Sequence, residues 1–78
     1  LQYVPQDNVY VYFRYNTDES VMVVINNNPE AQELDLNRYT EGLEGYTLGK
    51  DVVNGQEFQL NETLKVEGKS PLVLELKK

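Results

Sequence analysis

Short hydrophobic runs alternate with polar turns along the whole chain, and the first two runs give the strongest pattern. Residues 9–15 (VYVYFRY) are almost all β-branched or aromatic, and residues 21–25 (VMVVI) are apolar at every position. Both compositions favour β-strands, and the polar connector at 16–20 has the length of a hairpin loop. We therefore predict an antiparallel hairpin whose second strand, apolar on both faces, is central in its sheet.

Alternation within residues 9–15 divides their side chains between two faces of the predicted sheet. We predict that one set forms part of the core: Val9, Val11, Phe13 and Tyr15. The other set is either partly exposed to solvent or covered by a neighbouring domain: Tyr10, Tyr12 and Arg14. In the second strand we expect Ile25 to be buried, so that replacing it by alanine costs about 2–5 kcal/mol.

Further strand patterns follow, separated by turn residues. Residues 32–36, 63–66 and 70–77 each alternate between aliphatic and polar positions, and a short alternating run at 1–4 ends at Pro5. We predict that the aliphatic positions of the first three of these segments face the core: Leu34, Leu36, Leu64, Val66, Leu72, Leu74 and Leu76.

The dipeptide Asn54-Gly55 is a strong local hairpin signal. Both central residues of a type I′ turn need a positive φ, and Asn-Gly is the pair that best accepts it. Residues 37–47 are less regular, and we predict a loop there with one helical turn, capped by Asn37 and interrupted by Gly42 and Gly45. A strand-like stretch at 46–48 is expected to break at Gly49.

Seven or eight short strands without a convincing amphipathic helix predict an all-β fold. The turn spacing favours an antiparallel β-sandwich with Greek-key-like connections, and a small closed barrel is the alternative. With 78 residues the chain has room for one core, so we expect a single domain, 1–78. Because it opens on Leu1 in mid-pattern, we expect it to be excised from a larger protein.

Charge and composition exclude several classes of function. Thirteen acidic residues against seven basic ones give a net charge of -6, which argues against nucleic-acid partners and anionic membranes. The chain lacks cysteine and histidine, so thiolate metal sites, disulfides and the commonest general base are excluded. The acidic residues alternate with core positions or lie in turns. We predict no catalytic residue, no cofactor and no metal site.

Six tyrosines are the remaining feature that could carry function. Tyr10 and Tyr12 share one face of a predicted strand, where they could stack on sugar rings or pack against another domain. We favour the domain interface and keep glucan stacking as the alternative.

Three stretches together resemble a known family. They are the hairpin with its following turn (VYVYFRYNTDESVMVVINNN), the segment GYTLGKDVVNGQEFQL, and the final leucine-alternating run SPLVLELK. The resemblance is to the C-terminal domain of cyclomaltodextrinase and neopullulanase-type enzymes of the alpha-amylase superfamily, and it covers nearly the whole chain.

The resemblance implies a non-catalytic structural domain of a glycoside hydrolase. In such enzymes a catalytic (β/α)₈ barrel hydrolyses α-glucans such as cyclomaltodextrins, pullulan and maltodextrins, and the C-terminal β-domain packs on that barrel. The expected partner is therefore the barrel of the same polypeptide. The alternative is an independent carbohydrate-binding module that stacks glucan on Tyr10 and Tyr12.

Overall fold

Strands dominate the computed structural model, which describes Tyr3, residues 8–16 and residues 19–78. In chain order the elements are β1 (Val9–Tyr15), β2 (Ser20–Asn26), β3 (Gln32–Asp35), the 3₁₀ turn η1 (Leu36–Tyr39), α1 (Thr40–Leu43), β4 (Leu48–Asp51), β5 (Glu57–Gln59), β6 (Thr63–Val66) and β7 (Ser70–Lys77). The predicted opening hairpin is confirmed as β1 and β2, and the predicted strands at 32–36, 63–66 and 70–77 correspond to β3, β6 and β7.

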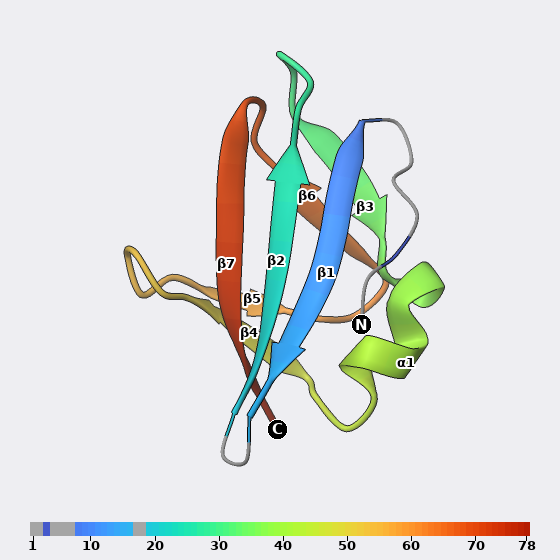
Figure 1. Ribbon diagram of the computed structural model, residues 1–78, viewed down its shortest axis with the longest axis vertical. Coiled ribbons are helices and arrows are strands. Elements are labelled where there is room, and N and C mark those ends of the chain that lie inside the picture. The colour runs from blue at the N-terminus through green and yellow to red at the C-terminus, as the bar shows by residue number, and fades with distance from the viewer. Residues whose placement is uncertain (1–2, 4–7, 17–18) are drawn as a thin grey trace.

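Two antiparallel sheets of unequal size form the layers of a sandwich (Figure 1). The larger has five strands in the order β1-β2-β7-β4-β5, and the smaller pairs β3 with β6. The chain crosses between the sheets on its way from β2 to β3, β3 to β4, β5 to β6 and β6 to β7. The all-β sandwich is therefore confirmed in preference to the closed barrel, and β2 is an interior strand of the larger sheet, paired on both edges.

The core lies between the two sheets and is closed at one side by the helical segment. Met22, Val24 and Leu74 of the larger sheet are completely buried, and Leu34, Leu64 and Val66 of the smaller sheet pack against them. All of the aliphatic positions predicted to face inward in residues 32–36, 63–66 and 70–77 belong to this core, Leu72 as a half-buried member. Alternation with period two therefore assigned these faces correctly.

Tyr15 and Ile25 correct two of the predicted core positions. Tyr15 is 55% exposed because it lies near the tip of the β1–β2 hairpin, which extends past the smaller sheet (Figure 1). Ile25 is 39% exposed because it points away from the smaller sheet, opposite Tyr10 of β1. The predicted strand at 1–4 falls largely outside the described residues, although the Tyr3 N–H donates to the Val11 carbonyl at 3.1 Å.

The helical turn forms where it was expected, but with a different cap and a different role for glycine. Asp35, not Asn37, caps it, since the Asp35 carboxylate accepts from the Asn37 N–H at 3.0 Å. Gly42 does not interrupt the turn but lies buried inside α1. A Cβ there would sit 2.6 Å from the Phe13 ring, so only glycine lets α1 approach β1 so closely.

The β4–β5 hairpin also differs from its prediction. Gly49 lies within β4 instead of ending a strand, because its missing side chain makes room for Leu74, 2.9 Å from where a Cβ would be. The loop has four residues, 52–55, closed by the Asp51 N–H donating to the Gln56 carbonyl at 2.8 Å. Within it only Gly55 has a positive φ, +77°, so the predicted type I′ turn is wrong.

Candidate functional site

A catalytic or metal-binding arrangement is not found among the described residues. No three of their Asp and Glu side chains lie where they could hold a metal ion. A groove of about 420 Å³ runs between the β4–β5 loop and the β6–β7 turn. Phe58 and Leu72 line it together with Asp51 and Glu67, but these side chains do not form a nucleophile–base pair. Among the described residues no helix is long and apolar enough to cross a bilayer.

The most distinctive surface is the side of the five-stranded sheet that faces away from β3 and β6, here called the outer face (Figure 1). Strand register defines it as three rows across β1, β2 and β7. The rows are Tyr10–Ile25–Pro71, Tyr12–Val23–Val73 and Arg14–Val21–Glu75.

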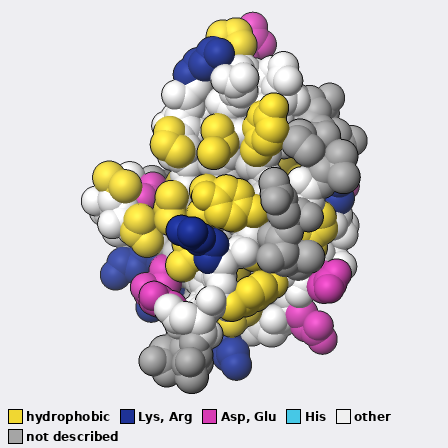
Figure 2. Space-filling model, in the orientation of Figure 1, with side chains coloured by type: hydrophobic (Ala, Val, Ile, Leu, Met, Phe, Trp, Pro, Cys, Tyr) yellow, Lys and Arg dark blue, Asp and Glu magenta, His cyan; other side chains and the backbone are white. Residues whose placement is uncertain are grey.

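The first two rows of the outer face are apolar throughout. Tyr10, Ile25 and Pro71 are exposed in the first row, and Tyr12 and Val73 are half-buried in the second. Figure 2 shows these side chains as a cluster of hydrophobic surface across the middle of the molecule. Antiparallel sheets that face water usually place polar residues there, so this face has the composition of a covered one.

The lack of polar residues on the outer face is clearest in β2. Its three outward positions are Val21, Val23 and Ile25, and none of them is polar. On the inward side Met22 and Val24 are completely buried. A strand that is apolar on both faces is typical of a sheet covered on both sides.

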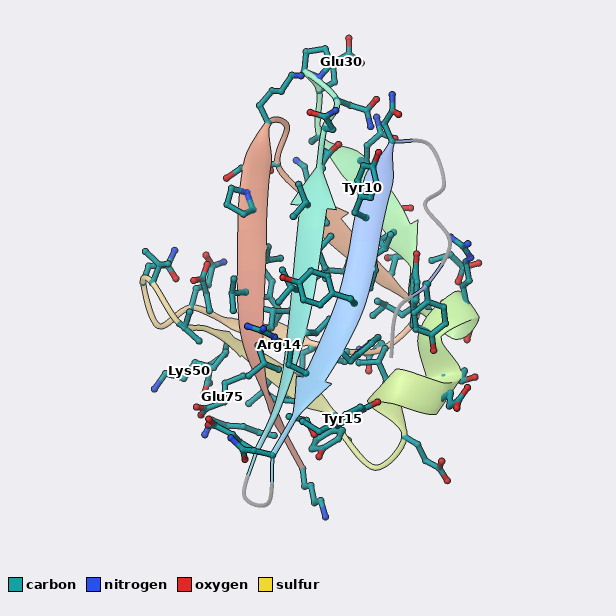
Figure 3. All side chains as sticks on the ribbon, viewed as in Figure 1. Tyr10, Arg14, Tyr15, Glu30, Lys50 and Glu75 are labelled. Carbon is teal, nitrogen blue, oxygen red and sulfur yellow. The ribbon has the colours of Figure 1, made fainter. Side chains whose placement is uncertain are left out.

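The third row differs, because it carries charge at the end near the β1–β2 hairpin tip. Glu75 lies beside Val21 on one side and Lys50 of β4 on the other, and Lys50 in turn lies opposite Glu57 of β5. In Figure 3 Lys50 and Glu75 lie together at the edge of the face, while Arg14 extends over β2.

One ion pair holds this charged edge together. The Lys77 Nζ lies 2.9 Å from Glu75 Oε1. The hydrogen bond from Lys77, and then its charge, hold the pKa of the Glu75 carboxyl below its ordinary value. The same contact raises the pKa of Lys77 above its ordinary value. A carboxyl whose pKa is lowered in this way stays ionised at neutral pH, so Glu75 is poorly suited to donate a proton.

The two tyrosines singled out from the sequence both belong to the outer face. Tyr10 is 42% exposed beside Ile25, and Tyr12 is half-buried beside Val23. The sequence reasoning did not find that Pro71 and Val73 of β7 complete the same rows. The signal for them was non-local, because it required knowing that the last strand pairs with β2.

A family model described as the cyclo-malto-dextrinase C-terminal domain matches residues 1–75. The chain belongs to this family. The resemblance seen in the sequence is thereby confirmed. No curated protein matches the chain closely enough to count as a relative.

Proposed function

We propose that residues 1–78 form one accessory domain that docks, through its outer face, on the catalytic barrel of the same polypeptide. The barrel would hydrolyse α-glucans such as cyclomaltodextrins, pullulan or maltodextrins, and this domain would stabilise it without taking part in the chemistry. The observation that carries the proposal is the apolar outer face of the interior strand β2: Val21, Val23 and Ile25.

Covering this face would bury a sizeable apolar area. Each large apolar side chain that passes from water into a contact contributes about 1.5–3 kcal/mol at most. Tyr10 and Ile25 are now less than half exposed, so each would contribute only part of that amount. Val23 is already buried, but the other five side chains of the first two rows together would still favour docking within one chain, where the entropic cost of association is reduced.

The chemistry of the face favours a protein surface over a sugar. Sugar recognition needs hydrogen-bonding groups around a stacking ring, because glucan hydroxyls lose their water on binding. The neighbours of Tyr10 and Tyr12 within their rows are Ile25, Pro71, Val23 and Val73, whose side chains offer no such groups.

Hydroxyl-radical footprinting of the full-length polypeptide tests the docking. We expect Tyr10 and Ile25 to be oxidised several-fold more slowly there than in the separate chain 1–78. Val53, which is 87% exposed on the β4–β5 loop, is the internal reference. Equal oxidation of Tyr10 in both forms would contradict the proposal.

A matched pair of substitutions makes the test specific. Ile25→Glu places a charge within the outer face and should return the oxidation of Tyr10 in the full-length polypeptide to the level of the separate chain. Val53→Glu makes the same kind of change outside that face and should leave the protection intact. Protection of Tyr10 in chain 1–78 by added maltoheptaose would instead support glucan stacking.

A further inference from the structure

Arg14 is a cation on a domain whose net charge is -6, and it lies at the border of the apolar outer face. Its side chain is exposed, and its cross-strand neighbour in the third row is Val21, which cannot pair with it. No residue that the structure describes forms an ion pair with Arg14.

The other charges of the same row have neighbours of opposite sign. Glu75 is bound to Lys77 at 2.9 Å and lies opposite Lys50, and Lys50 lies opposite Glu57. The charged row is therefore locally balanced on β4, β5 and β7. Arg14, on the far side of Val21, is the charge of this row for which the described residues provide no ion pair.

Docking changes the energy of such a charge. A guanidinium that enters an apolar interface loses its hydrating water, and this loss opposes docking unless a counter-charge replaces the lost hydrogen bonds. A carboxylate is the best counter-charge, since it can accept two parallel N–H bonds from arginine.

From this we infer that the surface of the catalytic barrel that covers the outer face carries an aspartate or glutamate opposite Arg14. This inference rests on the proposed docking and adds the chemistry of the partner surface: an apolar patch with one carboxylate at its border. Such a pair would fix the register of docking, because the apolar rows alone could slide against a flat partner.

Zero-length cross-linking of the full-length polypeptide tests the inference. A carbodiimide activates a carboxylate, which an adjacent amine then attacks to form an amide, whereas a guanidinium does not react. With Arg14→Lys we expect an amide joining position 14 to an Asp or Glu outside residues 1–78, and we expect no such product in the unmodified protein. Mass spectrometry of tryptic peptides identifies the linked positions.

Two lysines provide controls in the same sample. Lys50 lies opposite Glu57 and Glu75, so amides within the domain at Lys50 show that the reagent has acted. Lys65 lies exposed on β6, in the other sheet, and should give no link to the barrel. Because Arg14 is exposed, Arg14→Lys is expected to leave the fold unchanged, which circular dichroism checks.

The outcomes separate this inference from the docking itself. Suppose that Tyr10 is protected in the full-length protein but the amine at position 14 links only within residues 1–78, or not at all. The proposed docking then holds, and the inference of a barrel carboxylate opposite Arg14 is overturned. If Tyr10 is not protected, the proposed docking and the inferred barrel carboxylate are both overturned.

Discussion

Asn26 illustrates how a single polar side chain can tie the two layers together. It ends β2 and is completely buried. Its amide donates to the carbonyls of Glu30, Val66 and Glu67 at 3.0–3.2 Å, and its Oδ1 accepts from both nitrogens of Asn28 at 3.0 and 2.9 Å. The β2–β3 turn and the end of β6 are thus held by one amide group.

We predict that Asn26→Leu lowers the free energy of unfolding by about 3 kcal/mol, because it leaves buried carbonyls without their donors. Urea denaturation followed by circular dichroism measures the change. Asn27→Ala is the matched control. Asn27 is exposed, and among the described residues its side-chain Oδ1 accepts one long hydrogen bond, from the Lys69 Nζ at 3.4 Å. It should change stability by less than about 0.5 kcal/mol. Equal effects of both substitutions would contradict the role given to Asn26.

The Glu75–Lys77 pair predicts a pH dependence with a defined sign. Since Lys77 lowers the pKa of Glu75, the pair stabilises the fold above the ordinary glutamate pKa, and this contribution is lost as pH falls through the lowered one. The raised pKa of Lys77 means that the same contribution is lost again as pH rises through that value. Carboxyl NMR titration should find the pKa of Glu75 below the ordinary value. Lys77→Met should move it back up, and an unchanged pKa would argue against the contact.

At the scale of elements, the inner and outer sides of β2 should respond differently to truncation. Met22→Ala should cost about 2–5 kcal/mol in chain 1–78, because Met22 is completely buried in the core. Ile25→Ala should cost only about 1 kcal/mol, since Ile25 is already 39% exposed. This corrects the larger cost expected from the sequence. Thermal or urea unfolding measures the loss of stability in both variants. Similar losses would mean that the outer face is covered even in the separate chain.

Elements defined by local alternation could be predicted from the sequence, and those defined by distant contacts could not. β1, β3, β6 and β7 follow period two closely, so their inward faces were found, except at Tyr15. β4 was misread because Gly49 resembles a strand breaker until Leu74 of β7 is known to lie over it. The predicted type I′ turn failed because a four-residue loop also uses glycine at positive φ.

The candidate site was predictable only in part for the same reason. Tyr10 and Tyr12 could be assigned to one face from β1 alone. Pro71 and Val73 joined them only when β7 paired with β2, a contact between residues about fifty positions apart. The polar end of the face likewise depends on β4 and β5, which place Lys50 and Glu57 beside Glu75.

At the scale of the whole molecule, we expect chain 1–78 to show no hydrolysis of cyclomaltodextrin or pullulan. Among the described residues no Asp or Glu is buried, as the proton donor of a glycoside hydrolase would be, and Glu75 is paired with Lys77. A reducing-sugar assay on the purified chain measures this. Turnover that disappears when one carboxylate is replaced would contradict it, whereas turnover that survives every such replacement would indicate a contaminant.

The position of β7 has a consequence for how the protein is made. β7 lies between β2 and β4, yet it is the last of the seven described strands to be synthesised. Until it leaves the ribosome, the β1–β2 hairpin and the β4–β5 hairpin have no strand between them and cannot join into one sheet. The domain therefore folds only after nearly all of its residues have been translated, and a chain cut short before Ser70 would lose the middle of its main sheet instead of a dispensable edge.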